Sequence, residues 1–113
     1  MPLPRISLST LALCAGLFAS PALAQAINGQ YDAYSCHSGP ISDSVLRITW
    51  PTLSFHESTC TISESIAGAE NTYLMHCSGE GEYWASQIRI TPQVGGDLVI
   101  NIRGSDTVFR RCN

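Results

Sequence analysis

The sequence predicts an all-β domain, a small antiparallel meander closed or nearly closed into a barrel of seven or eight strands and held by two disulfides. Beyond Gln25, apolar residues recur at every second position, which is the pattern of half-buried strands rather than of helices. Turn-forming residues interrupt this pattern about every eight to twelve positions, as in small all-β domains. Four of the five cysteines lie beyond Gln25, and an even set of this kind in a short chain predicts a disulfide framework. These cysteines are Cys36, Cys60, Cys77 and Cys112.

Residues 1–24 are predicted to be a signal peptide. Arg5 is the only charged side chain among them, the run Ile6–Ala19 is apolar or small, and Ala22-Leu23-Ala24 fits an A-x-A cleavage site. Residues 25–113 then form a single exported β-domain in the periplasm or outside the cell. No stable membrane insertion is expected after cleavage.

Two alternatives to a cleaved signal are weaker. An uncleaved membrane anchor is disfavoured because the apolar run is short and no positive flank follows Ala24. A lipoprotein anchor at Cys14 is disfavoured because Leu13 stands where the motif of known lipoproteins has a small residue.

The charge composition narrows the classes of partner. The whole chain has a net charge of −3, and the loss of Arg5 makes the exported part more negative. It contains no lysine and has no basic stripe, so the sequence predicts no nucleic-acid binding. A mildly acidic surface favours a cationic protein or another envelope macromolecule, although acids that serve solubility alone would give the same composition.

Four strands are predicted in the first half of the domain. They are Gly29–Cys36, Ser44–Trp50, Thr52–Glu57 and Ser58–Ser63. The stretch His37-Ser38-Gly39-Pro40 forces a loop after the first of them, and Pro51 ends the second. Glu64–Glu70 is polar and small, and we expect a loop there because it is too short for a stable helix.

The second half carries four more predicted strands. They are Asn71–Cys77, Glu82–Thr91, Leu98–Arg103 and Asp106–Cys112. Gly79 and Gly81 give the backbone the freedom for a tight turn between the first two, and Gly104-Ser105 is the expected two-residue turn between the last two. Trp84 has the parity of Ile88 and Ile90, which places it in the core.

The predicted closure also predicts the disulfide pairing. In a closed meander the first and last strands become neighbours, which brings Cys36 next to Cys112. Cys60 and Cys77 flank the polar loop at Glu64–Glu70 and are expected to form the second bridge. The two other pairings would cross the sheet.

The candidate binding surface is the tip of the hairpin between the fifth and sixth predicted strands. Carboxylates, flexible glycines and an aromatic side chain coincide there, a combination that suits contact with a cationic partner. The residues are Ser78, Gly79, Glu80, Glu82 and Tyr83. The alternative is a merely solvated turn.

Catalytic and metal-binding functions have little support, and no catalytic residue, cofactor or metal is predicted. Each histidine lies close to a cysteine in the sequence, but neighbours on a strand point to opposite faces and export favours disulfides over thiolates. The three histidines are His37, His56 and His76. Glu80 and Glu82 would share a strand face, as glycosidase carboxylates must, but a chain this short rarely supplies the deep cleft. A metal-binding or hydrolytic domain remains as an alternative.

Scattered residues also carry a family resemblance. Tyr34-Ser35-Cys36, Ser78-Gly79, Tyr83 and the terminal Cys112 resemble positions in the small periplasmic inhibitors of c-type lysozyme. That resemblance implies an exported, cystine-linked β-barrel that plugs the cleft of the enzyme. The pattern of Glu57-Ser58, Cys60 and Cys77-Ser78-Gly79-Glu80-Gly81 is similar to uncharacterised small exported proteobacterial proteins, which imply no function. We therefore expect a non-catalytic binding or interaction domain of the cell envelope, with a lysozyme inhibitor as the alternative.

Overall fold

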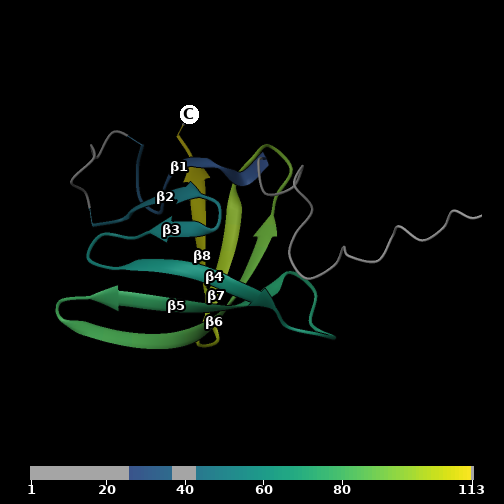
Figure 1. The fold of residues 1–113 in the computed structure, drawn as a ribbon. Helices are drawn as coiled ribbons and strands as arrows, with labels where there is room; N and C mark the ends of the chain where they lie inside the picture. Colours follow the sequence, from purple (N-terminus) through teal and green to yellow (C-terminus); the bar gives the residue numbers. More distant parts are fainter. Residues whose placement is uncertain (1–25, 37–42, 113) are drawn as a thin grey trace, which may run out of the picture.

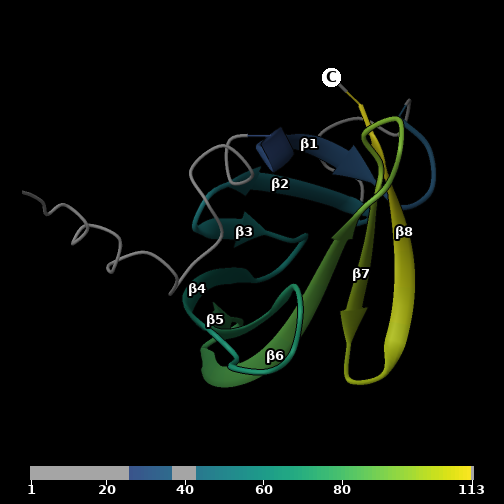
Figure 2. The same cartoon turned by 90° about the vertical axis from the view of Figure 1, so that its right-hand side faces the viewer.

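Eight antiparallel strands follow one another along the chain and close into a barrel in which β8 pairs with β1 (Figures 1 and 2). The computed structural model describes residues 26–36 and 43–112, and the predicted signal peptide, residues 1–24, lies outside them. The strands are β1 (Gly29–Asp32), β2 (Val45–Thr49), β3 (Thr52–Ser54), β4 (Thr59–Ser65), β5 (Thr72–Gly79), β6 (Glu82–Pro92), β7 (Leu98–Ile102) and β8 (Ser105–Arg111). The predicted all-β barrel is confirmed. No helix in the described ranges is long and apolar enough to cross a membrane.

The barrel interior is filled by the apolar side chains that alternate along the strands. In β5, for example, Tyr73, Met75 and Cys77 are buried while His76 between them is exposed. All eight strands contribute at least one buried side chain to a single cluster. Burying one large apolar side chain is worth roughly 1.5–3 kcal/mol, so this alternation supplies most of the driving force for folding.

The first strand ends at Asp32, earlier than the predicted Gly29–Cys36, because the Asp32 side chain turns the backbone. Its Oδ1 atom accepts hydrogen bonds from the backbone N–H groups of Tyr34 at 2.8 Å and Ser35 at 3.1 Å, and from the Ser44 hydroxyl. Burial raises the pKa of this carboxyl, but the three hydrogen bonds outweigh that effect and hold the pKa below its usual value. A turn of this kind competes with a sheet ladder and ends it.

The boundaries of β3 and β4 also differ from the prediction. The strand expected at Thr52–Glu57 stops at Ser54, because the N–H of Phe55 donates to the carbonyl of Ser58 at 2.8 Å and closes a tight loop. Strand β4 extends beyond its predicted end at Ser63 and takes in the first part of the expected loop. The remainder of that loop is confirmed.

The turn between β7 and β8 consists of Arg103 and Gly104 rather than the predicted Gly104-Ser105. Ile102 pairs with Ser105, which leaves two residues between the strands. Both have positive φ, 57° at Arg103 and 82° at Gly104. Two consecutive left-handed residues form a type I′ turn, whose twist matches that of a hairpin, and this preference shifts the turn by one residue.

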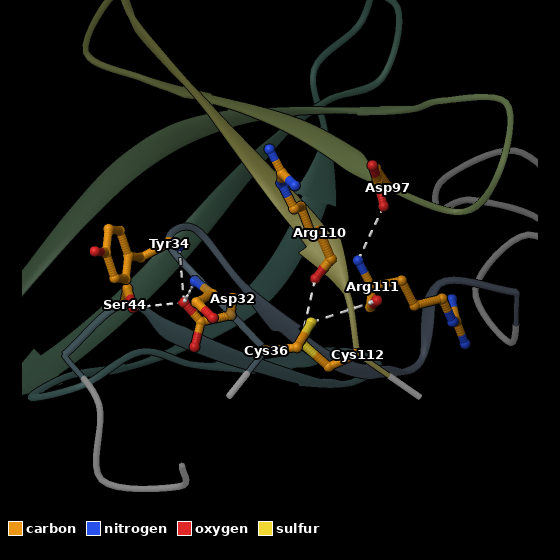
Figure 3. The surroundings of a disulfide bond; sticks show 9 residues. Asp32, Tyr34, Cys36, Ser44, Asp97, Arg110, Arg111 and Cys112 are labelled. Carbon is orange, nitrogen blue, oxygen red and sulfur yellow. Dashed lines mark hydrogen bonds between the residues drawn. A yellow bond between two sulfur atoms is a disulfide. The ribbon is translucent and has the colours of Figure 1, made fainter. Parts of the chain in front are cut away.

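Both predicted disulfides are confirmed. Cys60 and Cys77 lie directly opposite each other on β4 and β5, and both are buried. Cys36 and Cys112 join the segment after β1 to the end of β8 (Figure 3). Cys36 is exposed. The first bridge therefore lies inside the barrel wall, and the second lies across its closure.

The closure between β1 and β8 has a short ladder and strong side-chain support. Only two residue pairs align, Tyr31 with Arg111 and Asp32 with Arg110. The Arg111 guanidinium donates to the carbonyls of Ala26 at 2.9 Å and Asn28 at 2.7 Å and to the Tyr31 hydroxyl at 2.8 Å. It also lies 5.4 Å from the centroid of the Tyr31 ring, a cation–π distance. We call this region, β1, β8 and the Cys36–Cys112 bridge, the seam.

Candidate functional site

The residues predicted to bind lie at the tip of the β5–β6 hairpin, which points to the left in Figure 1. Strand β5 continues past Cys77 to Gly79, and β6 begins at Glu82, so only Glu80 and Gly81 form the turn. Their φ angles are 51° and 80°, which again makes a type I′ turn. The ladder of eight residue pairs beneath the turn holds the tip in one position.

The two glycines of the tip have different roles. Gly81 supplies the left-handed turn residue, as predicted. Gly79 belongs to the strand, and it must be small because the loop between β3 and β4 approaches it closely. A Cβ atom on Gly79 would collide with the carbonyl oxygen of Glu57 and lie 3.1 Å from the Cα and Cβ of Ser58. The β3–β4 loop therefore packs on the hairpin tip.

This contact gathers three carboxylates around a shallow hollow of about 280 Å³. Its lining residues are Glu57, Ser58, Gly79, Glu80, Glu82 and Trp84. The hollow joins the β3–β4 loop to the hairpin. We call it the acidic hollow.

Two of the carboxylates are close enough to interact directly. A hydrogen bond with Glu57 and the negative charge of Glu57 raise the pKa of Glu80, and nearby His56 offsets part of this rise. His56 Nε2 lies 3.3 Å from Glu57 Oε2. His56 therefore compensates the crowded negative charge only when it is protonated.

Trp84 gives the acidic hollow an apolar wall. It pairs with Cys77 in the hairpin register and packs against the core cluster, but it is only half-buried. Trp84 is therefore on the core side of β6, as predicted, but its side chain is only partly buried. Its exposed part faces the same hollow as the carboxylates.

The hairpin register separates the predicted site into two faces. Ser78 pairs with Tyr83 and Gly79 with Glu82, and successive residues of a strand point to opposite sides. Glu82 therefore lines the acidic hollow with Glu80, whereas Ser78 and Tyr83 lie on the other face. Tyr83 is 86% exposed there. A partner could contact both faces only by wrapping over the tip.

His56, Glu57 and Ser58 were not among the residues predicted to bind. A signal for them existed in the predicted Cys60–Cys77 bridge. Cys60 and Cys77 are opposite one another in an antiparallel pair, so the residue three before Cys60 approaches the residue three after Cys77. Those residues are Glu57 and Glu80.

The described residues offer no centre for metal chemistry. Within residues 26–36 and 43–112, no group of three or more histidine, cysteine, aspartate or glutamate side chains lies close enough to hold a metal ion. All four cysteines of the domain are in disulfides and cannot act as thiolate ligands. His37 lies outside the described residues.

Comparison of the chain with protein-family models, curated proteins and solved structures found no match.

Proposed function

We propose that this protein is a small exported, non-catalytic binding domain of the cell envelope, and that the acidic hollow contacts a cationic protein or other macromolecule. The supporting observation is the contact between Glu57 and Glu80, which raises the pKa of Glu80. Two carboxylates held together oppose each other when ionised, so their proximity disfavours the folded state at neutral pH. A cationic group of a partner placed between them would relieve this repulsion.

The surroundings of the pair support binding rather than catalysis. The Glu57 side chain is 61% exposed, so water screens both carboxylates. A catalytic carboxylate pair works in an enclosed site where its pKa values are kept apart. Trp84 beside the acids supplies apolar contact area, which is the usual companion of charge at a protein interface.

The two disulfides are consistent with an oxidising extracellular or periplasmic compartment. Residues 1–24, as a signal peptide, would deliver the domain there. Detection of the mature domain in the periplasmic or secreted fraction, with an N-terminus after Ala24, tests this part of the proposal.

Binding through exposed acids should depend on salt. Charges at a surface are screened over about 8 Å at physiological ionic strength, so complex formation should be fastest at low salt and slow down as salt is added. A partner that binds through apolar contact alone would show little salt dependence.

The test is capture of partners from envelope extract by the immobilised mature domain, compared with a Glu57→Gln/Glu80→Gln/Glu82→Gln variant. The matched control, Asp43→Asn/Glu64→Gln/Glu70→Gln, removes the same charge from exposed positions elsewhere. We expect the first variant to lose a cationic partner and the control to retain it. Equal capture by the two variants would reject the acidic hollow as the contact surface.

Inhibition of c-type lysozyme is a second candidate function. Two exposed tyrosines from the resemblance, Tyr34 at 81% and Tyr83 at 86%, lie after β1 and at the start of β6. In an antiparallel meander, the connections that follow odd-numbered strands reach the same end of the barrel, so both tyrosines belong to that end. An assay of lysozyme activity with wild-type, Tyr34→Ala and Tyr83→Ala proteins decides this point. Inhibition that the Tyr83→Ala variant loses would favour the inhibitor over a general binding domain.

A metal-binding or hydrolytic domain is the remaining alternative. Metal analysis of the purified mature protein together with thiol counting separates it from a binding domain. Stoichiometric zinc or copper with free thiols would overturn the proposal.

A further inference from the structure

We propose that the protein has a second site, of opposite charge, which binds a carboxylate. It lies where β7 diverges from β6. Strand β6 runs from Glu82 to Pro92, but it pairs with β7 only from Ile88 onward. A hollow of about 340 Å³ occupies the fork between the two strands. This site is independent of the acidic hollow.

Two arginines line the fork, Arg89 on β6 and Arg103 in the β7–β8 turn. Within the described part of the chain, neither guanidinium has a hydrogen-bond or ion-pair partner. Arg111, in contrast, satisfies three acceptors, and Arg47 donates to Gln30 at 3.1 Å. In a chain with a net charge of −3, two arginines without partners in one hollow point to an external anion.

The position of Arg103 is unusual for its residue type. Its φ is 57°, in the left-handed region where glycine, asparagine and aspartate are favoured. An arginine there is conformationally unfavourable, and the apolar core gains nothing from its exposed side chain. Such a residue is often kept for the use of its side chain, and this side chain lines the fork.

Neutral polar groups complete the lining. Thr72, Arg89 and Asn101 are aligned across β5, β6 and β7, so their side chains lie on the same face of the sheet. The Asn101 amide donates to the Asp106 carboxylate at 2.8 Å. Asp106 therefore has a neutral partner, and the arginines of the fork remain available to a ligand.

The chemistry favours a small ligand with one carboxylate. A guanidinium presents paired donors that match a planar carboxylate, and the amide and hydroxyl groups around it suit hydroxyl or amide groups of the ligand. The volume is near the lower end for ligand sites, roughly 300–1,000 Å³. A polyanion is disfavoured because the protein is acidic and Asp106 lies beside the site. A sugar acid and the carboxyl end of a peptide both carry the required group.

The test is a titration of the ¹⁵N-labelled mature domain, followed by amide chemical shifts, with glucuronate, with N-acetylalanine, and with glucose as the neutral match. We expect either acid, at millimolar concentration, to shift the amides of β6 and β7 at the fork, and glucose to leave them unchanged. The acid that binds more tightly identifies the source of the carboxylate. The absence of shifts at the fork with both acids would overturn the proposal.

Two variants assign the effect to the arginines. Arg89→Gln and Arg103→Asn should each weaken binding roughly tenfold, the loss expected for one charged hydrogen-bonding partner. Asparagine is chosen because it tolerates the left-handed turn. Arg110→Gln, which removes the same charge on β8, should bind like the wild type. Spectra of each free variant verify folding, and tenfold weakening by Arg110→Gln alone would also contradict the site.

Discussion

The β5–β6 hairpin and the seam between β1 and β8 are held together in opposite ways. The hairpin has eight aligned residue pairs and needs little from its side chains at the tip. The seam has two aligned pairs and relies on a disulfide and the Arg111 guanidinium, while the Asp32 carboxylate fixes the turn that leads from β1 to Cys36. A long backbone ladder leaves side chains free for binding, whereas a short ladder requires side chains for stability.

Removal of the bridges should have the largest effect, and it should be greater at the seam. The Cys36–Cys112 bridge spans 76 residues and the Cys60–Cys77 bridge spans 17. The chain-entropy model gives stabilisations of about 4.5 and about 3 kcal/mol for loops of these lengths. Denaturant unfolding of the Cys36→Ser/Cys112→Ser and Cys60→Ser/Cys77→Ser variants measures both. If the Cys36→Ser/Cys112→Ser variant lost less unfolding free energy than the Cys60→Ser/Cys77→Ser variant, loop length would not be the main determinant of the stabilisation by each bridge.

Arg111→Ala should cost about 2–4 kcal/mol, because it removes three hydrogen bonds from a charged donor, two of them to the part-buried Asn28 carbonyl and Tyr31 hydroxyl. Arg110→Ala removes an exposed side chain from the neighbouring position of the same strand and should change stability by about 0.5 kcal/mol or less. Urea unfolding of the two variants makes the comparison. Equal losses would mean that Arg111 contributes no more than a surface charge.

Asp32→Ala should cost about 2–3 kcal/mol at neutral pH, because two backbone N–H groups and the Ser44 hydroxyl lose their acceptor. The pKa of Asp32 is lowered in the folded state. The contribution of the ionised Asp32 carboxylate to the free energy of unfolding is therefore complete above its pKa in the unfolded chain, about 3.9. This contribution is lost as the pH falls through the pKa in the folded state. The difference in unfolding free energy between wild type and variant should shrink in acid. Asp43→Ala, at an exposed position, is the control and should show no such trend.

Within the hairpin, Gly79→Ala should cost more than Gly81→Ala. A methyl group at Gly79 meets the backbone of Glu57, and overpacking of this kind costs about 1–3 kcal/mol. Gly81 has φ of 80° but open space around it, so alanine costs only the left-handed conformation, about 1–2 kcal/mol. Thermal unfolding of both variants, read with the shifts of the β3–β4 loop amides, tests the order. Loop shifts that are larger in the Gly81 variant would contradict the packing.

The sequence predicts the features that follow from a periodic pattern along the strands. It misses the features that depend on a single side chain. Alternation and turn residues predict the strands because each strand buries one face. Closure predicts the Cys36–Cys112 bridge, and the place of Cys60 and Cys77 on either side of the polar loop predicts the other bridge. The early end of β1 depends on one carboxylate, Asp32, whose hydrogen bonds no periodic pattern reveals. The acidic hollow needs the β3–β4 loop beside the hairpin, a contact that only the register at Cys60 and Cys77 could reveal. Arg111 is one of two adjacent arginines, and the adjacent apolar residues Val108 and Phe109 leave open which face of β8 points inward. The structure buries Phe109, so Arg111, two residues on, shares the inner face.

Stability of the Glu80→Gln variant tests most directly whether the tip holds its acids against their mutual repulsion. The pKa of Glu80 is raised in the folded state, so its ionised form lowers stability above that pKa, and this loss disappears as the pH falls towards the unfolded value of about 4.3. We predict that Glu80→Gln unfolds at a higher denaturant concentration than the wild type at neutral pH and at the same concentration in acid, whereas Glu64→Gln shows neither change. A Glu80→Gln protein that is less stable than the wild type at neutral pH would contradict the account. In that case the Glu80 carboxylate would stabilise the fold, and Glu57 and Glu80 would not be held together against their repulsion.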